Sequence, residues 1–104
     1  MESQYKKGLI ELCVLKILSD KECYGYELIE SVSNVLSVTK GTLYPLLRRL
    51  QKDGYLEYYI KESDFGPARK YYKITSLGMD RFKKNKIEWF KIAVSVTNFL
   101  KGDN

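Results

Sequence analysis

The sequence predicts a mainly helical α+β fold in which three helices, a small β-hairpin and one long C-terminal helix follow one another. Two observations support this order: apolar residues recur at helical spacing in four segments, and alternation with a period of two replaces that spacing after Gly54. The 104 residues suffice for one hydrophobic core. We therefore expect one folded domain over residues 1–75 and a dimerisation helix over residues 76–104.

The first two helices are predicted from their apolar residues. Between Lys6 and Asp20 these residues cover most of a helical wheel, which is typical of a central buried helix. A second helix is expected over about 24–35, after a polar linker. Cys13 and Cys23 lie in apolar surroundings outside any metal-binding pattern, so we expect buried reduced thiols.

A third helix is predicted between Thr39, a plausible N-cap, and Gly54, a natural residue for the C′ position. Its leucines at 43, 46, 47 and 50 share one face. Pro45 lacks an amide hydrogen and its ring crowds the carbonyl of Gly41. We therefore expect the regular helix to begin only at about Gly41 or Thr42.

The hairpin is predicted from two alternating runs, one from Leu56 to Lys61 and one from Tyr71 to Ile74. The turn-forming residues 63–67 join them, and we expect a longer loop there. Thr75 or Ser76 can cap the last helix, which extends to about Leu100. Helices two and three, joined by a three- or four-residue turn and followed by a hairpin, form a winged helix-turn-helix, whose second helix enters the DNA major groove.

The composition excludes several classes of function. The chain has no histidine, which removes the commonest general base and the commonest zinc ligand. No nucleophile and base stand at a recognisable spacing, so we expect no enzyme, no metal site and no cofactor. No secretory signal and no sufficiently long apolar run occur, which predicts a soluble cytoplasmic protein.

Positive charge points to a polyanionic partner. The net charge is +5, and the excess of lysine and arginine lies in residues 38–104. An ordinary solvated helix face would explain the third helix alone equally well. A second basic element on the hairpin favours DNA binding over that alternative. The candidate contacts on these two elements are Lys40, Thr42, Tyr44, Arg48, Arg49, Lys52, Arg69, Lys70 and Lys73.

The last helix carries more apolar surface than one small domain can cover, which predicts a two-fold dimer. Trp89, the single tryptophan, lies on this stripe. Its indole either packs in the interface or lines a pocket for a flat aromatic ligand, and the residues slightly favour packing. The expected dimerisation residues are Phe82, Phe90, Ala93, Val96 and Leu100.

Four segments together resemble the PadR family of bacterial transcriptional regulators. They are Tyr24–Leu28, Gly41–Leu50, Lys52–Leu56 and Arg69–Gly78, and the second is highly specific. The resemblance spans about residues 5–100. The single C-terminal helix resembles the short subfamily.

The resemblance implies a homodimeric, nucleoid-associated repressor that binds an inverted-repeat operator and is released by a small aromatic effector, such as a phenolic acid or a flat lipophilic drug. It implies that Lys70 belongs to the wing and that Trp89 corresponds to the interface aromatic of multidrug-sensing members. Residues facing DNA by the family pattern are Tyr26, Thr42, Tyr44, Pro45 and Arg48. The alternative from another class is a winged-helix protein-interaction module that binds neither DNA nor a small molecule.

Overall fold

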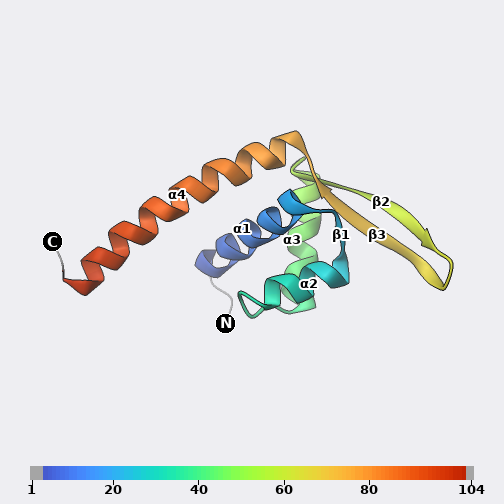
Figure 1. Ribbon diagram of the computed structural model, residues 1–104, viewed down its shortest axis with the longest axis horizontal. Coiled ribbons are helices and arrows are strands. Elements are labelled where there is room, and N and C mark those ends of the chain that lie inside the picture. Colours follow the sequence, from blue (N-terminus) through green and yellow to red (C-terminus); the bar gives the residue numbers. More distant parts are fainter. Residues whose placement is uncertain (1–3, 103–104) are drawn as a thin grey trace.

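The computed structural model describes residues 4–102 as a helical body with two projections (Figure 1). A β-hairpin extends from one side and the C-terminal helix from the other, so the molecule measures 59 × 29 × 21 Å. The mainly helical α+β class is confirmed. The elements are α1 (Gln4–Asp20), β1 (Cys23–Tyr24), α2 (Gly25–Ser33), α3 (Lys40–Lys52), β2 (Leu56–Ser63), β3 (Gly66–Ile74) and α4 (Ser76–Lys101).

Helix α1 lies at the centre of the body, as its apolar wheel predicts. Ile10, Val14 and Leu15 are completely buried. They share one core with leucines of α2 and α3 and with Tyr72 of β3. A helix that is apolar on most sides is stable in water only when other elements cover it on most sides. Here α2, α3, β3 and α4 provide that cover.

Helix α3 begins at Lys40, one or two residues before the predicted start at Gly41 or Thr42, and includes Pro45 in its second turn. The backbone N–H groups of Thr42 and Leu43 donate to the carbonyl of Thr39, so Thr39 is the N-cap, although its side chain caps no backbone group. At the other end the N–H groups of Gly54 and Tyr55 donate to the carbonyls of Gln51 and Leu50. This Schellman ending requires the positive φ of 86° at Gly54, which confirms its predicted C′ position.

The connection between α2 and α3 covers residues 34–39 and is longer than the turn expected from sequence. Helix α2 ends at Ser33, two residues before the predicted end, and the backbone turns again at Val35 and Leu36, whose N–H groups donate to the carbonyl of Val32. At the start of α2, the backbone N–H of Tyr24 donates to the carboxylate of Glu27.

The sheet has three antiparallel strands in the order β1-β3-β2. Strand β1 was not predicted, because it has only two residues and pairs with Tyr71 and Tyr72 far along the chain. The expected longer hairpin loop was also wrong: β2 ends at Ser63, β3 begins at Gly66, and only two residues lie between them. Pro67 is tolerated in β3 because, beyond β1, no strand among the described residues pairs with one edge of β3.

Thr75 joins the hairpin, the end of α3 and the start of α4. Its hydroxyl donates to the carbonyl of Gly54 at 2.6 Å and accepts from the N–H of Gly78 at 3.0 Å. The predicted cap of the last helix is thus confirmed. Gly78 lies so close to Tyr55 that a Cβ atom there would stand 2.1 Å from the Tyr55 carbonyl oxygen. These contacts fix the point at which α4 leaves the body.

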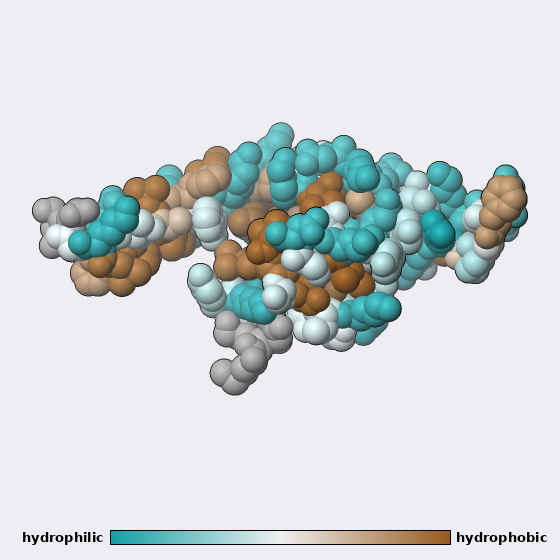
Figure 2. Space-filling view, turned by 60° about the horizontal axis from the view of Figure 1, so that its bottom comes forward, coloured by the Kyte–Doolittle hydropathy of each residue, from teal (hydrophilic) through white to brown (hydrophobic). Residues whose placement is uncertain are grey.

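Helix α4 divides into a packed beginning and an exposed remainder. Phe82 is only 6% exposed and belongs to the core of its own domain, so its assignment to the dimer interface was wrong: the α1 contact leaves little of its ring for a partner. Beyond it, the apolar side chains lie open to solvent (Figure 2). The strongly exposed ones are Ile87, Trp89, Phe90, Ile92, Val94, Val96, Phe99 and Leu100. Within residues 4–102, no helix is long and apolar enough to cross a bilayer.

Candidate nucleic-acid interface

The outward face of α3 lies opposite its four buried leucines. At 100° per residue, Pro45, Arg48 and Lys52 fall on that side, and all three are exposed. Arg48 makes no hydrogen bond or ion pair with any residue that the structure describes, so its guanidinium is free to bind an external acceptor. Lys40, the first residue of the helix, is also exposed, whereas Thr42 is half-buried beside Thr39.

Tyr44 connects α3 with the start of α2. Its ring packs on Gly25, where a Cβ atom would come within 2.9 Å of ring atoms, so only glycine allows this approach without a shift. Directly after Gly25 comes Tyr26, which is 52% exposed and stacks on Tyr24 with ring centroids 6.4 Å apart. The Tyr44 ring therefore packs on the residue directly before Tyr26, although 18 positions separate the two tyrosines.

Arg69 of the hairpin joins the same surface. Its guanidinium lies 4.6 Å from the ring centroid of Tyr24, a cation–π contact. Tyr24 also packs on Tyr71, which stacks on Tyr59. The cationic surface, by which we mean Arg48, Tyr44, Tyr26, Tyr24 and Arg69, thus extends from the outward face of α3 across the start of α2 to β3.

Lys70 lies on the opposite face of the hairpin, because successive strand residues point to opposite sides. Its ammonium is 4.0 Å from the ring centroid of Tyr58 and 5.4 Å from that of Tyr72. Lys73 returns to the face of Arg69 but pairs with Glu57 at 3.3 Å. The basic residues of β3 thus form two faces instead of the single patch that their sequence positions suggest.

Arg49 is turned away from the cationic surface. Its guanidinium donates to the carboxylate of Glu11 at 3.1 Å and stands 3.9 Å from Asp53. It flanks the outward face of α3 on the side of α1, so the structure gives it an intramolecular partner where the sequence predicted DNA. Glu11 itself was missed, because a single carboxylate within an apolar helix carries no signal of what it meets.

Outside the cationic surface, two thiols and one phenol have raised pKa values. Burial raises the pKa of the Cys13 and Cys23 thiols, and both remain unpaired, so little reactive thiolate forms near neutral pH. The Tyr59 hydroxyl donates to Glu22 at 2.6 Å, and this bond raises the pKa of the phenol. Among the described residues, no group of three or more His, Cys, Asp or Glu could hold a metal ion.

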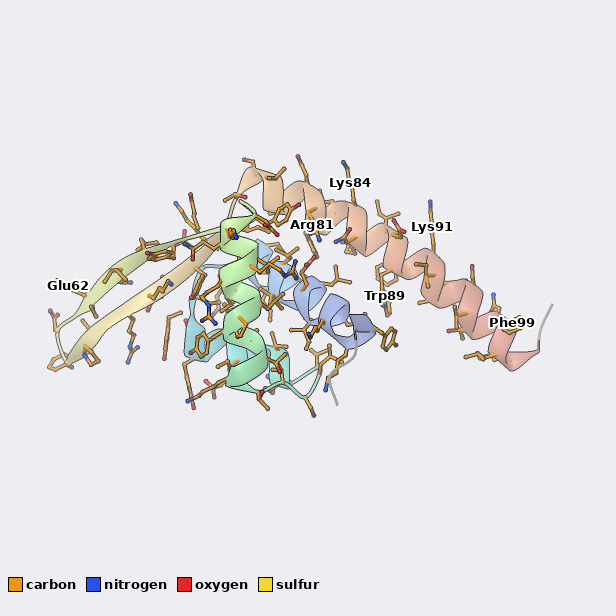
Figure 3. The ribbon with its side chains drawn as sticks, turned by 180° about the vertical axis from the view of Figure 1, so that it is seen from behind. Glu62, Arg81, Lys84, Trp89, Lys91 and Phe99 are labelled. Atoms are coloured by element: carbon orange, nitrogen blue, oxygen red, sulfur yellow. The ribbon has the colours of Figure 1, made fainter. Side chains whose placement is uncertain are left out.

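Trp89 points from α4 toward the start of α1, whereas Lys84 and Lys91 point away from the body (Figure 3). The indole is 40% exposed and meets the Phe90 ring edge-on. It borders an almost wholly apolar hollow of about 430 Å³. The walls of this hollow come from α1, the end of α2 and α4, with Leu12, Leu36 and Phe82 among them.

Comparison with known proteins identifies the family. The model of the transcriptional regulator PadR-like family matches residues 14–84, which include α2, α3 and the whole hairpin. The chain belongs to the PadR family. A PadR-like transcriptional regulator from Bacillus cereus is 41% identical, with a TM-score of 0.84 over 94% of this chain and 97% of that one.

Two further relatives are transcriptional regulators. A PadR family transcription regulator from Clostridium difficile is 32% identical, with a TM-score of 0.81 over 88% of this chain and 97% of its own. A transcriptional regulator from Mycobacterium tuberculosis is 34% identical over 72% of this chain and 70% of that protein. The resemblance inferred from sequence is thereby confirmed, as is the winged-helix fold with a long C-terminal helix.

Proposed function

We propose that this PadR protein is a homodimeric repressor that binds an inverted-repeat DNA operator. The observation that carries the proposal is the continuity of the cationic surface, from Arg48 on α3 to Arg69 on the wing. Arginines can read guanine edges or bind phosphates, and exposed tyrosines can pack on sugars and donate to phosphates. Lys40, Thr42 and Pro45 complete the α3 contact, and Lys70 reaches the backbone from the other wing face.

A second copy of the chain is the partner that best suits the distal half of α4, which we define as residues 87–101. Helix α4 has 26 residues and is about 39 Å long, but only its beginning packs on the body. The side chains of Trp89, Ala93, Val96 and Leu100 follow one another at helical spacing, as a helix–helix contact requires. A two-fold contact here would place two copies of α3 on one side of the dimer.

Repression follows from occupancy, because a bound dimer excludes other proteins from the same promoter DNA. Release by a flat aromatic effector is the finer part of the proposal. It is supported by the apolar hollow beside Trp89, whose volume and lining suit a small aromatic molecule. A ligand there would contact both α1 and α4 and so would favour one arrangement of the two.

Selection of bound DNA from a random pool tests the DNA-binding part. We expect an inverted repeat whose half-sites are centred about 10 base pairs apart or a multiple of that distance. The logarithm of its binding constant should fall linearly with the logarithm of salt concentration. Two results would instead favour the protein-interaction module. In the first, the selection enriches no sequence. In the second, the protein binds selected and nonspecific DNA equally, and only at low salt.

Fluorescence of Trp89 tests the effector part, because this is the single tryptophan. Flat cationic dyes and phenolic acids should change its emission and weaken operator binding by about 5- to 150-fold, with DNA weakening the ligand by the same factor. In Trp89→Ala the release of DNA by these compounds should be lost while the dimer persists. If a dye displaces DNA from Trp89→Ala as well as from the wild type, the indole packs in the interface and does not line a ligand pocket.

A further inference from the structure

Glu11 is a buried carboxylate held by two arginines from two different helices. Among residues 4–102 it is the one buried charged residue, with 7% of its side chain exposed. Arg49 of α3 donates a hydrogen bond to Oε1 of Glu11 at 3.1 Å. Arg81 of α4 donates through its Nε–H to Oε2 at 2.9 Å and through a second N–H group to Oε1 at 3.4 Å. Both carboxylate oxygens are therefore occupied.

Arg81 is held in place from a second side. It donates to the hydroxyl of Tyr55 at 3.2 Å, and its guanidinium lies 4.5 Å from the centroid of the same ring. Figure 3 shows Arg81 directed from α4 toward the body. The hydrogen bonds that Arg81 donates to the Glu11 carboxylate raise the pKa of Arg81, so its guanidinium stays charged. We call Glu11, Arg49, Arg81 and Tyr55 the charged junction.

The charged junction joins the two elements that the proposed function assigns to different tasks. Arg49 is adjacent in the chain to Arg48, whose side chain faces outward from α3. Arg81 precedes Phe82, the core residue after which α4 leaves the body. Apolar contacts resist separation but allow sliding, whereas a two-point guanidinium–carboxylate pair fixes direction as well as distance. The angle between α3 and α4 therefore depends on this carboxylate.

We propose that Glu11 is a positioning residue that sets the distance between the two DNA-reading helices of the dimer. This inference rests on the proposed function, in which α4 joins the copies and α3 reads each half-site. If the junction holds α3 at a fixed angle to α4, the two copies of α3 have one fixed separation. The half-site spacing of the operator must then match it. Glu11 itself touches no DNA.

The test is a spacing profile. Operators with the selected half-sites but with zero, one or two base pairs added or removed at the centre are titrated with the full-length protein. We expect the wild type to prefer one spacing by about fivefold or more, which corresponds to about 1 kcal/mol. Glu11→Gln should reduce the preference between neighbouring spacings to less than about twofold, while the preferred half-site sequence stays the same. A loss of stability alone would lower all affinities without changing the profile.

The chain offers a matched control in α1. Asp20→Asn makes the same carboxylate-to-amide change but breaks only the exposed pair with Lys16, within one helix. It should keep the wild-type profile. Arg81→Lys is the second variant, because it keeps the charge on α4 and loses the two-point contact. It should flatten the profile even if Glu11→Gln fails to fold.

The outcomes separate the inference from the proposed function. A wild type that binds no inverted repeat would overturn the proposed function, and the inference with it. If the wild type prefers one spacing and Glu11→Gln, as a folded dimer, keeps the same preference, the inference alone would be overturned. If Glu11→Gln does not fold, an unchanged profile in Arg81→Lys would do the same. The inference is supported if the spacing preference is lost in Glu11→Gln or in Arg81→Lys while Asp20→Asn keeps the wild-type preference.

Discussion

The two projections of the molecule expose surfaces of opposite character. The wing and the adjoining face of α3 present cations and tyrosines, many of them already in contact with one another. The distal half of α4 presents mainly isoleucine, valine, leucine and aromatic side chains. Neither surface is complete within one chain, but each needs a different partner. The first suits a polyanion, and the second suits an apolar helix such as its own copy.

This contrast separates two kinds of interaction that respond differently to salt. Phosphate binding releases counterions and weakens steeply as salt rises. Apolar burial has no such dependence and is strengthened by some salts. The protein should therefore lose its DNA before it loses its partner chain when sodium chloride is increased. The following substitutions test whether the two surfaces are as independent as they look.

The largest effect is expected from charge on the distal half of α4. In Val96→Glu combined with Leu100→Glu, two carboxylates per chain would enter an apolar contact, and the dimer should weaken by at least about 1,000-fold. Both residues are exposed in one chain, so circular dichroism should show an intact fold. Sedimentation equilibrium gives the association constant. Lys91→Glu, on the side of α4 facing away from the body, is the charge-matched control and should remain a dimer.

A smaller effect is expected at the outward face of α3. Arg48→Ala should weaken operator binding by about 1 to 3 kcal/mol and relax the preference for one base pair, if this side chain reads a base edge. Fluorescence anisotropy with single-base operator variants measures both quantities. Arg49→Ala is the neighbouring control: since its guanidinium binds Glu11, specificity at each base should be retained. Equal loss of base preference in both variants would contradict the assigned geometry.

The smallest effect is expected at Lys70 on the other face of the wing. Its ammonium rests over tyrosine rings, and we expect it to contact a single phosphate. Lys70→Ala should weaken selected and unrelated DNA alike and reduce the slope of log K against log salt by about one. Titrations at four or five salt concentrations give that slope. A loss confined to the selected operator would mean that Lys70 takes part in reading the sequence.

Much of the fold was predictable because its signals are local. The leucines of α3, the C′ position of Gly54 and the cap at Thr75 depend only on neighbours in the chain, and each occupies the predicted place. Strand β1 and the tight hairpin turn were missed, since the first depends on a distant strand. The turn-forming residues 63–67 suggested a longer loop than the two-residue turn they make.

The sequence predicts which residues belong to the DNA-binding surface better than it predicts where their side chains lie. The sequence identifies the basic and aromatic residues, but Arg48 and Arg49 look equivalent until the position of Glu11 is known. Phe82 and Val96 likewise share one apolar stripe, yet only Phe82 meets the core, because α4 diverges from α1 beyond it. Burial depends on which element lies opposite, and no pattern within a single helix contains that information.

In the proposed function, α3 reads DNA within a dimer assembled by the distal half of α4. The most direct measurement compares the affinity of the wild type and of Val96→Glu/Leu100→Glu for a full inverted repeat and for a single half-site. The wild type should bind the full repeat at least about 100-fold more tightly than the half-site. Once one α3 of the dimer is bound, the second α3 meets its half-site at a high effective concentration. The charged variant should bind both DNAs with the same weak affinity. If the charged variant instead keeps the wild-type ratio, the dimer is not formed through α4 and the account is contradicted.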